Sequence, residues 1–161
     1  MTIKVGDTIP QATLVKATAE GPGTISTAEL FGGRTVALFS VPGAFTPTCS
    51  AKHLPGFVTR AAKLAEAGVD EIVCLSVNDA FVMGAWAKSA NAVGKVTMIA
   101  DGNADFTKAL GLEMDASKYG MGVRGQRFSM VVKDGVVAKL FVEEPGAFAV
   151  SSAEHMLANL G

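Results

Sequence analysis

The chain has 161 residues, 49% of them hydrophobic, which is enough to bury the core of one domain, 1–161, without disulfides or structural metals. Its 14 Lys and Arg residues balance 15 Asp and Glu residues, so no charge excess indicates nucleic acid, a membrane surface or a polyanion as partner. Two cysteines outside any CxxC pair exclude a disulfide framework and indicate neither a zinc site nor a dithiol motif. With no leader pattern and no apolar run of about 20 residues, the predicted location is the cytoplasm.

The amino-terminal third contains the first strongly apolar run. Residues 1 to 30 alternate weakly, and Gly21-Pro22-Gly23 favours a turn, so short strands or a hairpin are expected there. The run VALFSV at 36 to 41 has the length of a strand and the composition of one buried on both faces. It ends at Pro42-Gly43, and we expect it to be a central strand.

A helix is expected directly after this strand. Thr46 can cap it, Pro47 suits its first turn, and apolar residues recur at helical spacing from 54 to 68. Pro55 removes one backbone donor and predicts a kink. Cys49 would then lie in the first turn.

The alternation of strands and helices continues to about residue 110. Strands are expected at 71–77 and 95–100, and each precedes a helix. Asn78-Asp79 caps the first of these helices, which is expected to carry four apolar side chains on one face: Phe81, Val82, Ala85 and Trp86. Consecutive strands joined by helices predict an α/β sheet with parallel members, flanked by helices.

The carboxyl-terminal part is expected to begin with a loop at 113–126. Runs at 127–132 and 136–142 then flank Lys133-Asp134-Gly135, which is a strong signal for an antiparallel hairpin. The capping-box spacing from Ser151 to Glu154 predicts a final helix to residue 160. A mixed sheet of this order, with a cysteine after its first core strand, has the plan of a thioredoxin-like fold.

Cys49 has two interpretations, a small buried hydrophobe or a reactive nucleophile. A helix start stabilises a thiolate through its unpaired N–H groups and positive dipole potential. The neighbours Thr46, Thr48 and Ser50 are small or hydroxylic, so they are expected to leave the thiol reachable. The local sequence therefore favours the reactive thiol.

Four longer segments are distinctive: PGAFTPTCS at 42–50, HLPGF at 53–57, CLSVNDAFVMGAW at 74–86 and RFSMVV at 127–132. In their order along essentially the whole chain they resemble the peroxiredoxin family, in particular its type II or peroxiredoxin-5-like branch. The PxxxTxxC element is present as Pro42, Thr46 and Cys49. The resemblance implies a thiol peroxidase that reduces hydrogen peroxide and organic hydroperoxides through a Cys49 sulfenic acid, with no metal and no organic cofactor.

The resemblance also implies roles for individual residues. Thr46 would hold the sulfur and the peroxide in line, Pro42 would shield the thiolate, and Arg127 would stabilise the thiolate and polarise the peroxide. Taken alone, these residues indicate only a helix cap, a strand terminator and a solvated edge charge. Nearby Arg124 has no such role.

The two histidines are given no catalytic role. His53 lies one helical turn beyond Cys49, which raises a Cys/His nucleophile and base pair. We reject this pair because a histidine at that spacing should point along the surface, and because the resembling family assigns it no base role. His155 on the last helix is expected to be structural.

Two kinds of thiol could reduce the Cys49 sulfenic acid, a second cysteine of this chain or an external thiol. Cys74, within an apolar strand, is by default a small buried hydrophobe, although some type II members carry a cysteine there that is a candidate resolving thiol. Animal members have another resolving cysteine near the C-terminus, where this chain has Val150-Ser151-Ser152. An external reductant is therefore expected, either glutathione with glutaredoxin or thioredoxin.

The resemblance further implies a homodimer, whose surface the apolar Phe45 and Phe81 can join, while Met83 and Trp86 are expected in the core. Two other functions remain as alternatives. One is a thioredoxin-like disulfide oxidoreductase, against which the missing CxxC argues. The other is a peroxide sensor or redox-controlled binding module that uses the same cysteine.

Overall fold

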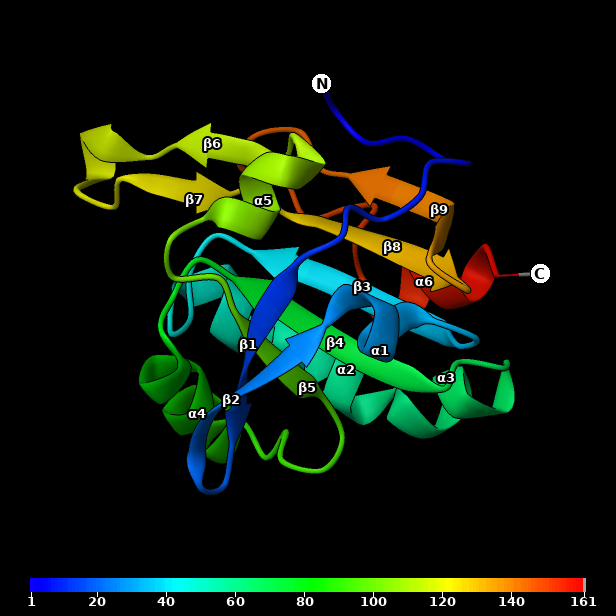
Figure 1. The fold of residues 1–161 in the computed structure, drawn as a ribbon. Coiled ribbons are helices and arrows are strands. Elements are labelled where there is room, and N and C mark those ends of the chain that lie inside the picture. The colour runs from blue at the N-terminus through cyan, green and yellow to red at the C-terminus, as the bar shows by residue number, and fades with distance from the viewer. Residues whose placement is uncertain (161) are drawn as a thin grey trace.

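The computed structural model describes residues 1–160, and a mixed seven-stranded sheet forms its middle layer (Figure 1). The strand order is β2-β1-β5-β4-β3-β8-β9. The strands are β1 (Thr13–Thr18), β2 (Gly21–Ser26), β3 (Thr35–Val41), β4 (Glu71–Ser76), β5 (Thr97–Ala100), β8 (Phe128–Lys133) and β9 (Val136–Val142). The neighbours β3, β4 and β5 run parallel and every other pair is antiparallel, as the strand and helix pattern predicted.

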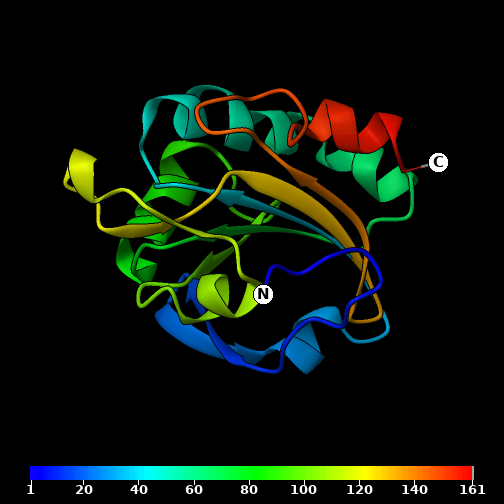
Figure 2. The ribbon, with the colours of Figure 1, turned by 90° about the horizontal axis from the view of Figure 1, so that it is seen from above.

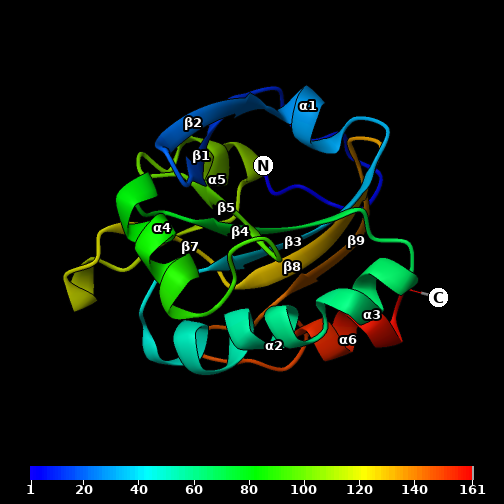
Figure 3. The same cartoon turned by 90° about the horizontal axis from the view of Figure 1, so that it is seen from below.

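Helices cover both faces of the sheet (Figure 3). One face carries α1 (Thr27–Phe31) and α5 (Asp105–Leu110), and the other carries α2 (Leu54–Thr59), α3 (Ala61–Glu66), α4 (Ala80–Ser89) and α6 (Ala153–Ala158). Each helix layer packs its apolar side chains against the sheet and forms a separate buried cluster. The sheet is therefore buried on both faces.

Strand β3 shows how the sequence produces this burial. Ala37, Phe39 and Val41 point into the cluster that contains α2 and α4, whereas Val36 and Leu38 point into the opposite cluster. All five side chains are at most 1% exposed, because successive residues of a strand face opposite sides. The predicted central strand is confirmed.

The helix expected from residue 46 to 68 is divided into three pieces. A π-helical turn, η1 (Cys49–His53), precedes α2, and α3 follows after a break at Arg60. The Leu54 N–H donates to the Cys49 carbonyl, five residues back rather than the four of an α-helix, and Pro55, which has no N–H, lies in the first turn of α2. The break in the helix is therefore a widened turn immediately before Pro55, and it includes Cys49.

Two expectations about turns and loops are wrong in detail. The hairpin β1–β2 exists, but it turns at residues 19 and 20, and Gly21-Pro22-Gly23 lies inside β2, an edge strand that tolerates proline. The segment 113–126 is more than a loop. It contains a small antiparallel pair, β6 (Glu113–Asp115) and β7 (Val123–Gly125), joined through the 3-10 turn η2 (Ser117–Tyr119).

The hairpin β8–β9 is confirmed, with Asp134 and Gly135 at φ 48° and 76° in its turn. Asp79 caps α4 by accepting from the Val82 N–H at 2.8 Å, also as expected. Of the four apolar residues expected on one face of α4, only Trp86 is buried, and Phe81 is 72% exposed. The buried side chains of α4 are Ala80, Met83, Trp86 and Ala87.

The final helix begins one residue later than the capping-box pattern predicted. Ser152, rather than Ser151, is its N-cap, and the Ser152 hydroxyl accepts from the His155 N–H at 3.0 Å. Ser151 is fully buried, and its N–H and hydroxyl donate to the Glu143 carboxylate. None of the helices in the described part of the chain is long and apolar enough to cross a membrane.

Candidate active site

Cys49 lies at the start of the helical segment that follows the carboxyl end of β3. Its sulfur belongs to the buried cluster on the α2 and α4 face of the sheet, and the residue is 0% exposed. The expectation that small neighbours leave the thiol reachable is therefore wrong for this conformation. A molecule that reacts with Cys49 must be small or must enter through a transient opening of this shell.

Arg127 reaches the sulfur of Cys49. It directly precedes β8, which is the neighbour of β3 in the sheet, and its Nη2 donates to Cys49 Sγ at 3.0 Å. The interpretation of Arg127 as a solvated edge charge is wrong, because the side chain is half-buried and turned inward. A guanidinium hydrogen bond at this distance stabilises a thiolate relative to a thiol.

Thr46 shapes the loop between β3 and Cys49. Its Oγ1 donates to the Gly43 carbonyl at 2.7 Å, so it does not provide the side-chain helix cap that the sequence predicted. A side chain at Gly43 would be tight, because its Cβ would lie 3.1 Å from Thr46 Cγ2 and 3.2 Å from Arg124 Nη1, so these neighbours would have to shift. The two residues therefore hold the loop close to the end of β3, three residues before Cys49.

Arg124 and Asn78 fasten this loop to the neighbouring strand. Arg124 Nη1 donates to the carbonyls of Pro42, at 3.4 Å, and Val77, at 3.1 Å. Asn78 Oδ1 accepts from the Ala44 N–H at 3.0 Å. Arg124 thus binds backbone rather than the thiol, and Pro42 stands at the strand end as predicted.

His53 is fully buried, so the expectation that it points along the surface is wrong. Its Nε2 lies 2.9 Å from the Ser151 carbonyl and its Nδ1 lies 2.9 Å from Arg127 Nη1. Because a carbonyl only accepts and a guanidinium only donates, the proton sits on Nε2 and Nδ1 accepts. Burial, and next the positive charge of Arg127, lower the pKa of His53 from 6.5 to about 3.

The neutral His53 ring contacts Arg127 and not the sulfur. It therefore has no base role toward Cys49 in this geometry. The Cys/His pair is still rejected, but because the ring binds Arg127 and not because it points along the surface. Three aromatic rings surround it, with centroids 4.9 Å away for Phe39, 5.8 Å for Phe57 and 5.0 Å for Phe148.

Glu143 is a buried carboxylate, only 7% exposed, that the sequence did not single out. It accepts hydrogen bonds from the backbone N–H groups of Ala149, Val150 and Ser151 and from the Ser151 hydroxyl. Burial raises the pKa of Glu143, but these hydrogen bonds together outweigh it and hold the pKa below 4.5. The sequence does not indicate this role, because Glu143 stands at the end of a strand, just before Glu144 and Pro145-Gly146, where an exposed acid is ordinary.

Cys74 occupies the middle of β4, opposite Phe39 of β3, and is fully buried. Both cysteines are free. Burial raises the pKa of Cys74 well above 9.0, and the nearby Cys49 raises it further. Cys74 therefore remains a protonated thiol, the small buried hydrophobe that is the default for a mid-strand cysteine.

Trp86 is a core residue, as expected, with 1% exposure. Its Nε1 also donates to Ser50 Oγ at 3.0 Å, a contact that the sequence did not indicate. Ser50 directly follows Cys49, so this bond ties α4 to the π-helical turn. It satisfies the one polar group of a buried indole ring.

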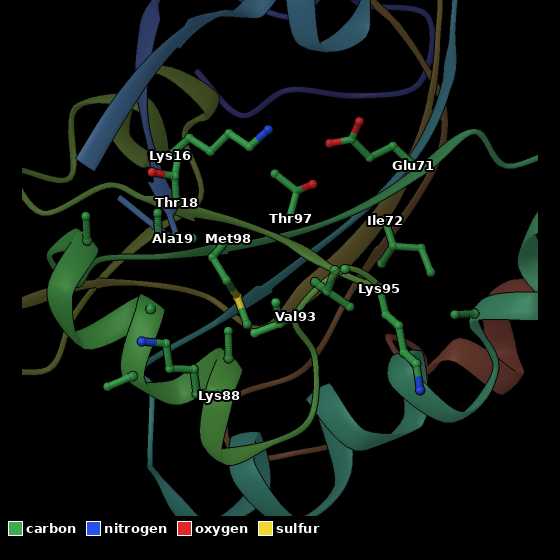
Figure 4. Close-up of a pocket in the computed structure, with 18 of the residues that line it drawn as sticks. Lys16, Thr18, Ala19, Glu71, Ile72, Lys88, Val93, Lys95, Thr97 and Met98 are labelled. Carbon is green, nitrogen blue, oxygen red and sulfur yellow. The ribbon is translucent and has the colours of Figure 1, made fainter. Parts of the chain in front are cut away.

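A cavity of about 840 Å³ lies away from this site (Figure 4). Lys16, Glu71, Thr97 and Met98 are among the residues that line it, and Cys49 and Arg127 are not. Glu71 and Thr97 are the first residues of β4 and β5, whereas Cys49 follows the carboxyl end of β3. Within residues 1–160, no group of three or more His, Cys, Asp and Glu side chains is arranged to hold a metal ion.

Comparison with known proteins gives consistent matches. The model of the Redoxin family matches residues 4–157. The chain is 53% identical to Peroxiredoxin-2E-2, chloroplastic, of Oryza sativa subsp. japonica, over 97% of this chain and 72% of that protein. It is 47% identical to Peroxiredoxin-2B of Arabidopsis thaliana, over 96% of each chain. Reduced Prx3 of Vibrio vulnificus in complex with H2O2 matches with a TM-score of 0.95 and 52% identity, over 99% of this chain and 100% of that one.

Proposed function

Because this chain belongs to the peroxiredoxins, within the Redoxin family, and is therefore a thiol peroxidase, we propose that Cys49 is the residue that reacts with peroxide. The family and the thioredoxin-like fold predicted from the sequence are confirmed by these relatives. The observation that carries the assignment of Cys49 is the hydrogen bond from Arg127 Nη2 to its sulfur. Cys74 has no comparable cationic partner among its side-chain contacts and is held protonated by burial.

In the proposed reaction, the Cys49 thiolate attacks one oxygen of the peroxide. A sulfur–oxygen bond forms, the O–O bond breaks, and the leaving oxygen departs with its electron pair and takes up a proton as water or an alcohol. Sulfur is oxidised to sulfenic acid and the peroxide is reduced. Arg127 stabilises the thiolate before attack and the negative charge that develops on the departing oxygen.

Thr46 and Pro42 are proposed to shape the place where the peroxide binds. The Thr46 hydroxyl now donates to Gly43, and a rotation about its side chain would let it donate to the peroxide instead. Pro42 presents no N–H at the end of β3, which helps keep water away from the sulfur. Both residues lie in the loop that Arg124 and Asn78 fasten.

Hydrogen peroxide is the substrate that we propose first. The Prx3 structure from Vibrio vulnificus contains H2O2, and that protein is 52% identical to this chain. A small substrate also suits a sulfur that is fully buried. Organic hydroperoxides would react through the same O–O bond and are included in the proposal.

The sulfenic acid is proposed to be reduced by an external thiol, either glutathione with glutaredoxin or thioredoxin. Cys74 is poorly suited to the task, because a resolving cysteine attacks as a thiolate and burial keeps this thiol protonated. Ser151 stands where animal relatives are expected to carry a resolving cysteine, and it is buried and hydrogen-bonded to Glu143. Neither residue offers a ready internal disulfide.

Steady-state turnover of H2O2 with each reductant tests this function, using wild type, Cys49→Ser and Cys74→Ser. We expect Cys49→Ser to consume no peroxide with either reductant, because the other thiol, Cys74, is held protonated by burial, and Arg127 donates its hydrogen bond to Cys49. Cys74→Ser should keep full glutaredoxin-supported turnover. Activity in Cys49→Ser would refute the assignment, and loss of activity in Cys74→Ser would refute external reduction.

We also propose that the protein forms a homodimer through the surface around Phe45 and Phe81. These two rings are 52% and 72% exposed, and exposed aromatic side chains are favoured in the buried part of an interface. Sedimentation should give a dimer for wild type and for Val5→Asp, a matched change at an exposed residue elsewhere, and a monomer for Phe81→Asp. Equal masses for the two variants would contradict this interface.

The cytoplasmic location expected from the sequence stays a prediction. Relatives with 53% and 48% identity carry names that place them in the chloroplast. Fractionation of the source cells, followed by detection of this chain, would decide it.

A further inference from the structure

The segment 143–152 between β9 and α6 closes over the cationic side of the site, and we call it the strap. Figure 2 shows it in orange, running beside the helical segment that follows Cys49. Phe148 of the strap packs on the His53 ring at 5.0 Å between centroids and lies 5.9 Å from the guanidinium carbon of Arg127. The strap thus contacts Arg127 and His53 directly.

Glu143 holds the two ends of the strap together. Its carboxylate lies at the first residue and accepts four hydrogen bonds of 2.7 to 2.8 Å from donors near the last, namely three backbone N–H groups and the Ser151 hydroxyl. Its own N–H donates to the Arg127 carbonyl at 3.0 Å. A buried carboxylate with this many donors is a strong, charge-assisted anchor.

A continuous chain of hydrogen bonds leads from this anchor to the sulfur. The Ser151 carbonyl accepts from His53 Nε2 at 2.9 Å, and His53 Nδ1 accepts from Arg127 Nη1 at 2.9 Å. Arg127 Nη2 then donates to Cys49 Sγ at 3.0 Å. One edge of the guanidinium is therefore fixed by His53 while the other edge faces the sulfur.

We propose that Glu143 is a positioning residue for the peroxidase reaction, which keeps Arg127 aimed at Cys49 by holding the strap, the Ser151 carbonyl and His53 in place. Glu143 does not touch the sulfur. It acts by reducing the freedom of a long side chain, since an arginine has many rotamers and a fixed partner restricts them before the reaction. The inference rests on the proposed roles of Cys49 and Arg127.

The variant Glu143→Gln tests this chain, because it keeps the shape of the side chain and removes the charge that four donors require. Glu144→Gln is the matched control, since it makes the same change at the adjacent, exposed residue. The readout is the rate constant for the reaction of the reduced protein with H2O2, measured across pH. We expect Glu143→Gln to lower this rate constant about tenfold and to move the pH range in which it increases to higher pH. Glu144→Gln should change neither the rate constant nor its pH dependence.

A double-mutant cycle separates positioning from a general loss of structure. In an Arg127→Gln background, Glu143→Gln should lower the rate constant less than about twofold, because the group that it positions is already gone. An equal tenfold loss in both backgrounds would overturn the proposal, and so would an unchanged rate constant in Glu143→Gln. If Cys49→Ser still reacts with peroxide, the proposed function fails instead.

A second variant covers the case in which Glu143→Gln does not fold. His53→Leu keeps an apolar side chain among the surrounding rings and withdraws the ring nitrogen that accepts from Arg127. It should lower the rate constant in the same direction and again have little effect in the Arg127→Gln background. A folded His53→Leu with the wild-type rate constant and pH profile would overturn the proposed chain of hydrogen bonds, because its contact with Arg127 would then be unnecessary.

Discussion

His53 couples the site to the stability of the protein through its proton. The folded protein keeps the ring neutral down to a pKa of about 3, whereas the unfolded chain binds a proton near the ordinary value of 6.5. Between these values the unfolded state holds one more proton than the folded state. The folded state therefore loses stability as the pH falls, and this penalty is absent above pH 6.5.

We predict that the free energy of unfolding of wild type falls by up to about 1.4 kcal/mol per pH unit, on account of His53, as the pH is lowered from 6.5 to 4.5. Glu143 also begins to take up a proton in the unfolded chain near pH 4.5, but it does so in wild type and in a His53 variant alike, so the difference between the two proteins isolates His53. Denaturant unfolding of wild type and His53→Gln across this range measures it. His53→Gln should have the flatter curve, and two parallel curves would contradict the burial of a neutral ring.

At the scale of single residues, the sequence indicated the proposed nucleophile, Cys49, but not the contacts that hold Arg127 beside it. Pro42, Thr46 and Cys49 share one short motif, and Arg127 was found only through its RFSMVV context. The contact between His53 and Ser151 joins residues 98 positions apart, and no local pattern reports such a pair. Helical spacing placed His53 on the surface, because it says nothing about the strap that covers it.

At the scale of elements, strands were predicted better than helix boundaries. The apolar runs that form β3 and β4 have the length of strands, so their composition predicted them correctly. Asp134-Gly135 favours a two-residue turn with positive φ, so the hairpin β8–β9 was predicted correctly as well. The π-helical turn at Cys49 was not predicted. The missing N–H of a proline indicates that a helix is interrupted, but it does not indicate which carbonyl the preceding N–H groups will bind.

The shift of the last N-cap from Ser151 to Ser152 has a tertiary cause. Both serines can cap a helix, and the local sequence favoured the first because Glu154 completes a capping box with it. Glu143, eight residues upstream, binds both the N–H and the hydroxyl of Ser151. That competition leaves Ser152 to cap α6, and it places the Ser151 carbonyl against His53.

For the whole molecule, the site depends on segments that are far apart in the chain. The loop after β3 brings Cys49, the start of β8 brings Arg127, and the strap before α6 brings the Ser151 carbonyl. The sheet sets the distance between the first two, because β3 and β8 are paired neighbours. The thiol can therefore be buried and still have a cation beside it.

The most direct test of the central claim is to locate the oxidised sulfur after a single turnover. The reduced protein is mixed with one equivalent of H2O2, a sulfenic-acid trap is added, and the labelled residue is identified by mass spectrometry of its peptides. We predict the label on Cys49, in wild type and in Cys74→Ser alike, with Cys74 unmodified in wild type. A label on Cys74, or oxidation of Cys49→Ser at the wild-type rate, would contradict the account.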